Sequence, residues 1–286
     1  MKIIENLELK YYNSYRVESV CKIAFFPKCE DDFIKIYKDF KAEEVIVIGG
    51  GYNIIFSKKH YEKPFVMVGE SYAGLSIDSD GLIVCEAGVS TKVFSEFALA
   101  NSLTGAEIFF DIPSSIGGAV VMNAGASGEE IKDILVKVRF LDLCDMTVKE
   151  IGKDEIGFDY RNSYFQKNTD KIVLKAWFKL NLGERSAIKS KMESIKEARW
   201  SKQPKDIPNA GSVFKRPKGY YVGAIIDDLG LKGFTIGGAK ISDKHGGFIV
   251  NFNQAKGQDI IDIINHVKLL TKTKFNIDLE VEQRII

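Results

Sequence analysis

Apolar residues cluster or alternate along much of the first half of the chain, a pattern typical of β-strands. Residues 45–48 are fully apolar, three consecutive glycines follow at 49–51, and residues 54–56 are apolar again. This order predicts a buried strand, a tight glycine loop and a second extended segment. We expect strands at residues 45–48, 54–56, 65–68, 82–85, 136–141 and 172–180.

Apolar residues at helical spacing predict helices between and after these strands. Residues 31–41 have acidic residues in their first turn, which favours a short amphipathic helix. A second helix is expected over residues 91–101. The spacing over residues 184–200 predicts a third, for which Ser186 is the expected N-cap.

The last helix is expected over residues 257–272, with His266 on its polar, solvated side. Strands therefore dominate the first half of the chain, and the character of the sequence changes near Gly183. This order predicts an α+β protein with a domain boundary near that glycine.

Composition fits two domains and sets limits on the partners. The 286 residues are 45% apolar and 28% charged, with 40 Lys and Arg against 39 Asp and Glu. A net charge of +1 without single-sign blocks argues against a nucleic-acid or polybasic membrane surface, although it leaves room for a local anion site. No run is apolar enough for a signal peptide or a membrane span.

The cysteines and histidines indicate no metal site by their spacing. The four cysteines contain no Cys-x-x-Cys pair, and the three histidines are far apart in sequence. Only a spatial convergence of these residues would create a metal site. We therefore expect reduced, buried cysteines and a cytoplasmic protein.

Two glycine-rich segments point to a phosphate-bearing ligand. Residues 49–51 follow a buried strand, but Ile54 occupies the position of the third glycine of a Rossmann motif, and no P-loop lysine follows. Residues 112–128 are rich in Gly, Ala and Ser, which let a backbone approach another body closely. Two such segments about sixty residues apart fit a dinucleotide held on both sides of its diphosphate. The alternative is a pair of tight loops that serve helix–strand packing.

Three further segments contain candidate chemistry: residues 158–163, 209–217 and 279–284. Taken singly, Arg161 is typical of a surface or salt-bridge arginine, Ser212 of a turn serine and Glu282 of an exposed strand carboxylate.

Taken together, these motifs resemble the family of UDP-N-acetylenolpyruvoylglucosamine reductases, in its shorter type. The resemblance extends along most of the chain and is strongest at residues 112–133, 158–166 and 203–286. It implies an FAD-binding region of two subdomains over residues 1–183, of the non-Rossmann, vanillyl-alcohol-oxidase-like type. It also implies a C-terminal α/β substrate-binding domain over residues 184–286, whose final strand returns to the active site.

The resemblance implies a two-step reaction. NADPH reduces the bound FAD and leaves, and the enolpyruvyl ether of UDP-N-acetylglucosamine then receives hydride at its methylene carbon and a proton at the neighbouring carbon. Arg161 matches the family's cation for the substrate carboxylate, Ser212 its proton donor and Glu282 its polarising carboxylate. These types suit the reaction, because charge that develops on an enolate needs a nearby cation and an acid.

Further residues match the family's binding positions. Expected at the cofactor are Gly49, Gly50, Gly51, Asn53, Ser115, Gly117, Gly118, Asn123, Ala124, Gly125, Tyr160 and Arg284. Expected at the substrate or its diphosphate are Lys215, Arg216 and His245, and for His245 a purely structural loop role has equal weight. No metal is expected.

The sequence departs from the family pattern on the FAD side. Tyr52 replaces a usual serine, Ser114 replaces a usual glycine, and the paired glycines that usually follow near the N-terminus are missing from residues 13–19. The three catalytic matches are intact.

Two alternatives to the reductase remain: a paralogous flavin reductase for another nucleotide-sugar or enol ether, and a non-catalytic flavin- or sugar-nucleotide-binding protein. Retention of a proton donor argues against the second. We expect a monomer whose partner is the small-molecule substrate, with no nucleic acid and no membrane.

Overall fold

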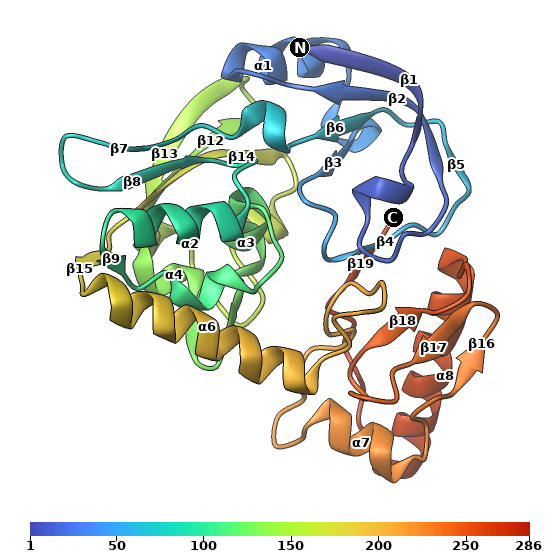
Figure 1. Cartoon of the computed structure of the whole chain (residues 1–286). Helices are drawn as coiled ribbons and strands as arrows, with labels where there is room; N and C mark the ends of the chain where they lie inside the picture. The colour runs from blue at the N-terminus through green and yellow to red at the C-terminus, as the bar shows by residue number, and fades with distance from the viewer. The chain divides into compact units, whose positions relative to one another are not determined.

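The chain folds as two interleaved units in the computed structural model, which describes residues 1–286 (Figure 1). The first unit comprises Met1–Glu5, Ile23–Gly50 and Lys63–Glu197. The second comprises Asn6–Lys22, Gly51–Glu62 and Ala198–Ile286.

The first unit contains a largely parallel sheet. β6 (Phe65–Met67) pairs with β3 (Ile46–Ile48) on one side and with β2 (Val20–Phe26) on the other, in register Val47↔Val66 and Ala24↔Phe65. β1 (Lys2–Glu8) continues the sheet beyond β2. β3 and β6 are the strands predicted over 45–48 and 65–68, whereas β1 and β2 were not predicted. The predicted helix over 31–41 is α1 (Glu30–Asp39).

A second, antiparallel sheet of the first unit has the order β13-β12-β14-β8-β7. Its strands are β13 (Thr147–Gly152), β12 (Leu135–Asp142), β14 (Lys171–Phe178), β8 (Ile83–Glu86) and β7 (Leu75–Ile77). The adjacent strands β12 and β14 are also the two longest that the sequence predicts. α2 (Thr91–Ala100) and α3 (Ile116–Met122) lie beside this sheet (Figure 1).

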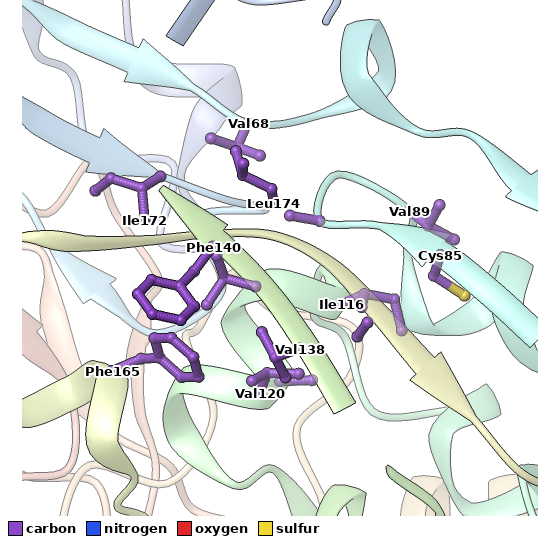
Figure 2. Close-up of a cluster of buried hydrophobic side chains, with 14 of the residues drawn as sticks. Val68, Cys85, Val89, Ile116, Val120, Val138, Phe140, Phe165, Ile172 and Leu174 are labelled. Atoms are coloured by element: carbon purple, nitrogen blue, oxygen red, sulfur yellow. The ribbon is translucent and has the colours of Figure 1, made fainter. Parts of the chain in front are cut away.

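The core of the first unit fills the space between α3 and this sheet. Figure 2 shows Val120 of α3 beside Val138 of β12, and the ring of Phe140 beside that of Phe165. The two rings pack edge to face with 5.5 Å between centroids. Burial of these apolar surfaces, worth roughly 25 cal/mol per Å², fixes α3 and the loops at its ends.

The second unit contains a small antiparallel sheet covered by a long helix. β17 (Ala239–Ile241) lies between β16 (Thr235–Ile236) and β18 (Ile249–Asn251). α8 (Gly257–Phe275), predicted over 257–272, packs on β16 and β17 (Figure 1).

A short parallel pair in the second unit joins the last strand to a segment near the start of the chain. β19 (Arg284–Ile285) pairs with β4 (Ile54–Ile55), in register Arg284↔Ile54. β4 follows Asn53, so the last strand lies next to the end of the glycine loop.

The remaining helices and strands are short, apart from α6. They are β5 (His60–Tyr61), β9 (Leu103–Thr104), β10 (Gly125–Ala126), β11 (Glu129–Glu130), β15 (Asn181–Leu182), α4 (Ile131–Ile134), α5 (Tyr164–Lys167), α6 (Arg185–Lys202) and α7 (Val222–Asp228). No helix is long and apolar enough to cross a membrane.

Three details of the sequence prediction are wrong. Ser186 does not cap α6: the Glu184 carboxylate, one residue ahead of the helix, accepts from the N–H groups of Ser186 and Ala187 at 3.0 and 2.7 Å. His266 is not simply solvated, since its ring stacks on Phe234 with 4.6 Å between centroids.

The cysteines are the third correction. All four are free, but only Cys21 and Cys85 are buried, whereas Cys29 and Cys144 are exposed. Cys144 lies in the turn after β12 and Cys29 directly precedes α1, and connecting segments of this kind lie at the surface.

Candidate active site

Arg161 of the first unit is held by a ring of acceptors. Its guanidinium donates to the carbonyls of Asn123 at 3.2 Å and Gly125 at 2.6 Å. The Glu130 carboxylate lies 3.7 Å from the same guanidinium. The arginine side chain is only 17% exposed, and its backbone is left-handed, with φ 51°. This region is unfavourable for a residue other than glycine, so the surrounding contacts must hold the backbone there.

Asn123 organises the loop that receives Arg161. It ends α3 in the left-handed conformation and is fully buried. Its side-chain amide donates to the Glu130 carboxylate at 2.9 Å and to the Asp159 carbonyl at 3.1 Å. The amide therefore connects the loop after α3 to the loop that contains Tyr160 and Arg161. Direct contact of Asn123 with the cofactor stays a prediction.

The two glycine-rich segments meet in the first unit. A Cβ on Gly49 would overlap the Ser115 hydroxyl, so only glycine allows this approach. Ser115 is the N-cap of α3, where its hydroxyl accepts from Gly118 N–H at 3.2 Å. This juxtaposition is what the dinucleotide hypothesis requires of the two segments.

The roles of the individual glycines in the second segment are different. Gly117 N–H donates to the Ala87 carbonyl at 2.9 Å, and Gly118 N–H donates to Ser115. A Cβ on Gly117 would lie 2.9 Å from that of Ala87, and one on Gly125 would overlap the backbone of Glu129. These glycines provide close packing, and their cofactor contacts stay predictions, as do those of Ala124 and Gly50.

The last glycine of the first segment and Asn53 belong to the second unit. Gly51 has φ 70°, and its carbonyl accepts from Ser14 N–H at 3.0 Å. Asn53 donates its side-chain amide to the Glu282 carbonyl at 3.1 Å, while its own carbonyl accepts from Arg284 N–H at 2.9 Å. The end of the glycine loop is thus bonded directly to the segment that contains Glu282.

Ser212 and Glu282 lie on paired segments of the second unit. Glu282 N–H donates to the Val213 carbonyl at 2.8 Å, and Phe214 forms a bridge with Val281. On the other side, Ser212 bridges Phe248. The Ser212 hydroxyl is partly buried and lies 3.3 Å from the Phe214 carbonyl.

The three residues expected at the substrate also belong to the second unit. Lys215 forms an ion pair with Glu280 at 2.5 Å, and the Arg216 guanidinium lies 3.8 Å from the centre of the Tyr221 ring. His245 is half-buried, and its Nδ1 accepts from Gly247 N–H at 3.1 Å. Burial lowers the pKa of His245, which favours the neutral ring. The contacts of these residues with substrate stay predictions.

Tyr52 and Ser114 are two of the positions at which the sequence departs from the family pattern. The Tyr52 side chain is 39% exposed. Ser114 accepts, through its carbonyl, from Thr91 N–H at 3.0 Å and donates its hydroxyl to the Ser115 carbonyl at 3.0 Å. Tyr160, on the Arg161 loop, is 43% exposed.

The loop donors fit a diphosphate. In the first unit, neither Gly49 nor Gly50 uses its N–H group as a donor to another backbone group, and backbone N–H groups of glycine turns are a common anion-binding device. The Ser115 hydroxyl, which accepts from Gly118, keeps its own proton for a further acceptor. The residues present therefore fit an FAD diphosphate.

Two functional candidates lie within segments that the sequence analysis singled out, but were not themselves named there. Glu130 becomes apparent only through its contacts with Asn123 and Arg161. Gln283, between Glu282 and Arg284, is 4% exposed and bonded to the backbone around Ser212. It stands between the charged Glu282 and Arg284, directly ahead of β19, and nothing in that local sequence marks it as buried.

A group of potential metal ligands occurs away from these residues, at Asp142, Cys144 and Asp170. The Lys171 ammonium lies 2.7 Å from Asp142, 2.6 Å from Asp170 and 3.6 Å from the thiol. Hydrogen bonds from Lys149, which has the larger effect, and from Lys171 hold the pKa of Asp142 far below its usual range. An ion-pair network thus accounts for this cluster.

Two protein-family models match the chain. The one described as FAD binding domain matches residues 21–152. The one described as UDP-N-acetylenolpyruvoylglucosamine reductase, C-terminal domain, matches residues 203–286. Together with the observed elements, these matches confirm the predicted α+β class and an FAD-binding region outside the Rossmann type.

Proteins named UDP-N-acetylenolpyruvoylglucosamine reductase are similar to this chain over nearly their whole length. The protein of Caldanaerobacter subterraneus subsp. tengcongensis is 38% identical over 287 residues, which cover 100% of this chain and 94% of the relative. The Francisella tularensis protein is 38% identical over 284 residues, with 99% of each chain covered. The crystal structure of the Thermus caldophilus reductase has a TM-score of 0.83 at 28% identity and covers 99% of this chain and 98% of that one.

Proposed function

The chain belongs to the UDP-N-acetylenolpyruvoylglucosamine reductase family, and from this premise we propose how its own residues perform the reaction. The enzyme is an FAD-dependent oxidoreductase that reduces the enolpyruvyl ether of UDP-N-acetylglucosamine to UDP-N-acetylmuramate. The resemblance of the catalytic motifs adds NADPH as the source of electrons.

The observation that carries the assignment of residues is the pairing of the Ser212 segment with the Glu282 segment. The bond from Glu282 N–H to the Val213 carbonyl keeps the two candidates on adjacent backbones of one unit. Asn53, at the end of the first glycine loop, is bonded to the same Glu282. Proton donor, carboxylate and the end of the cofactor loop are therefore one structural element.

Arg161 binds the substrate carboxylate in this proposal. When bound, the reduced flavin supplies the hydride that adds to the methylene carbon of the enolpyruvyl group. The electron pair of the double bond moves to the carboxylate-bearing carbon and into the carboxylate, where a fixed guanidinium stabilises the charge. The two carbonyls and Glu130 around Arg161 hold the cation in place before the substrate arrives, which is the property that such stabilisation requires.

Ser212 completes the reaction by giving its hydroxyl proton to the carboxylate-bearing carbon. Serine is a weak acid, so it serves here only because the enolate is a strong base placed within reach. The resulting alkoxide recovers a proton from solvent, and the product is a D-lactyl ether. Glu282 polarises the substrate and holds the arrangement.

The remaining expectations belong to the proposal as well. Lys215, Arg216 and His245 bind the UDP moiety, and Tyr160 and Arg284 lie near the flavin. The protein acts as a monomer in the cytoplasm on soluble precursors of peptidoglycan, and so serves cell-wall synthesis, cell shape and division.

The test is spectroscopic. Purified protein is expected to be yellow, to bleach on anaerobic addition of NADPH, and to recover its colour when the enolpyruvyl UDP-sugar is added. A colourless protein that does not take up FAD contradicts the proposal. Bleaching without recovery by this substrate indicates a paralogous reductase for another compound.

A single substitution tests the assignment of the proton donor. Ser212→Ala is expected to leave bleaching by NADPH unchanged and to slow recovery by about a hundredfold or more, because the donor is lost from the second step alone. Stopped-flow absorbance separates the two steps. Recovery at the native rate in this variant contradicts the role of Ser212.

A further inference from the structure

Gln283 is a buried glutamine directly between two residues of the proposed site. Its side-chain nitrogen lies 3.0 Å from the Ala210 carbonyl, 3.2 Å from that of Gly211 and 3.4 Å from that of Ser212. An amide nitrogen has two hydrogens, so three consecutive carbonyls share them. One side chain thereby holds the whole turn that ends at Ser212.

Tyr15 fixes the orientation of this amide. Its hydroxyl donates to the Gln283 carbonyl oxygen at 2.9 Å, and the tyrosine is 0% exposed. A reversed amide would direct its oxygen at three carbonyl oxygens and its nitrogen at a hydroxyl, which leaves the buried carbonyls without donors.

The loop that contains Tyr15 is itself fixed. The buried Asn13 side chain donates to the carbonyls of Leu9 at 2.9 Å and Val17 at 3.0 Å. Asn251 donates to the Tyr15 carbonyl at 2.7 Å. The order of contacts therefore runs from a rigid loop through Tyr15 and Gln283 to the backbone of Ser212.

The Ser212 turn needs such support on its N-terminal side. Gly211 has φ 80°, so the chain reverses just ahead of the serine. After the serine, Val213 is held by Gly247 on one side and Glu282 on the other, at 3.0 and 2.8 Å. On the N-terminal side, the Gln283 amide is the group that donates hydrogen bonds to the carbonyls of the turn.

We propose that Gln283 is a positioning residue for Ser212, with Tyr15 as its support, and this inference rests on the proposed function. The Glu282 N–H is bonded to the Val213 carbonyl, and the Gln283 side chain is bonded to the three carbonyls that precede it. Gln283 thus fixes the backbone that presents the hydroxyl. A misplacement of about 1 Å in such a group costs on the order of a hundredfold in rate.

The first test removes the amide and keeps its size. Gln283→Met is expected to leave bleaching by NADPH unchanged and to slow recovery with the enolpyruvyl UDP-sugar by about ten- to a hundredfold. Without substrate, the backbone amides of residues 212–214 are expected to exchange hydrogen faster in this variant. Gln258→Met, at an exposed glutamine on α8, is the matched control.

The second test uses a side chain whose donor depends on pH. In Gln283→Glu, a protonated carboxyl donates to a turn carbonyl and still accepts from Tyr15, whereas the ionised form repels the carbonyls. The recovery rate relative to native protein is expected to be higher at pH 6 than at pH 9. A merely structural role predicts no such dependence. Because both rates come from one folded protein, this comparison stands even where Gln283→Met does not fold.

The third test concerns Tyr15. Tyr15→Phe is expected to slow recovery less than Gln283→Met does, since the amide keeps its bonds to the turn. Tyr72→Phe is its control, because Tyr72 is equally buried but its hydroxyl has no partner.

The outcomes separate this inference from the proposed function. Native protein that bleaches and recovers supports the function. If it does so while Gln283→Met recovers within twofold of native, or while Gln283→Glu shows the same loss at pH 6 and pH 9, the positioning role is overturned and the function stands. If native protein does not recover with the substrate, the function itself fails.

Discussion

Arg161 combines a strained backbone with a side chain that is almost completely directed by its neighbours. A left-handed conformation costs a non-glycine residue on the order of 1–3 kcal/mol. The contacts that offset this cost include two hydrogen bonds, which two different nitrogens of the guanidinium donate to the carbonyls of Asn123 and Gly125. The fork of an arginine makes this arrangement, and the point charge of a lysine does not.

We therefore predict that Arg161→Lys slows recovery of the reduced enzyme by about a hundredfold while bleaching by NADPH keeps its rate. Because the positive charge remains in this variant, a loss of this size in the recovery rate would be due to the geometry of the guanidinium and not to its charge. Arg139→Lys is the control, since Arg139 is also a forked arginine, bonded to Glu30 at 2.9 Å by two of its nitrogens. Recovery unchanged in Arg161→Lys would show that charge alone suffices.

At His245, the neutral ring stabilises the second unit in a pH-dependent manner. Burial lowers its pKa in the folded protein, with Lys232 acting in the same direction and Asp227 against it. The unfolded chain has an imidazole pKa of about 6.5. The stabilisation is complete above that pH and is lost as the pH falls through the lower, folded value.

The prediction is that the unfolding free energy of native protein decreases between pH 7 and pH 5 by more than that of His245→Gln. Urea titrations at the two pH values measure the difference. His60→Gln, at an exposed histidine, should retain the native pH dependence. An identical dependence in His245→Gln would rule out the buried imidazole as its source.

Among the elements, the glycine loop between β3 and β4 depends most on one residue. Gly51 is left-handed, and a Cβ there would overlap the Tyr12 carbonyl of the same unit. The first property disfavours any side chain, and the second makes even a methyl group a steric conflict with backbone.

Gly51→Ala is accordingly expected to lower the unfolding free energy by about 2 kcal/mol or more and to weaken FAD retention, because Asn53 follows directly. Gly81→Ala separates the two causes. Gly81 has φ 76° but open space around its Cα, so its substitution is expected to cost less, about 1 kcal/mol. Equal losses in the two variants would mean that the Tyr12 contact is immaterial.

The sequence predicted elements where a pattern alternates over many residues or where a short run is fully apolar, as at β3, whereas the seven-residue β1 and β2 were missed. β12 and β14 begin and end within two residues of the predicted ranges, as does α1. Strands of two or three residues, such as β16 and β19, contain too few positions for any period. Their pairing is set by contacts that are remote in the chain.

Prediction of the site was limited by the same physics. Family motifs supplied Arg161, Ser212 and Glu282 because chemistry restricts those residue types. The supports around them are defined by geometry alone: Glu130 through a guanidinium 31 positions later in the sequence, and Gln283 through Tyr15, 268 positions earlier. Whether residues 1–183 and 184–286 form the functional domains stays a prediction, since the packing units are divided at other points.

At the scale of the whole molecule, the second unit is not contained in any single stretch of sequence. It needs residues 6–22 for Tyr15 and residues 51–62 for β4, the partner of β19. We predict that a fragment of residues 198–286 alone does not reach a native fold, because Gln283 and β19 would lack their partners.

Protection of the backbone amides against hydrogen exchange tests this prediction. The fragment is expected to show little protection in β17, β18 and around Ser212, whereas the full chain protects them. Addition of a peptide of residues 6–62 should restore part of the protection. If the fragment is protected by itself, the N-terminal segments are not required for the fold of the second unit.

The hydrogen bond between Tyr15 and Gln283 can form only late in the synthesis of the chain. The ribosome must add 268 residues after Tyr15 before its partner exists, which takes on the order of ten seconds or more at bacterial rates of elongation. During that interval Tyr15, which is fully buried in the folded protein, lacks its hydrogen-bond partner. The support for the serine is thus among the last contacts to form in a newly synthesised chain.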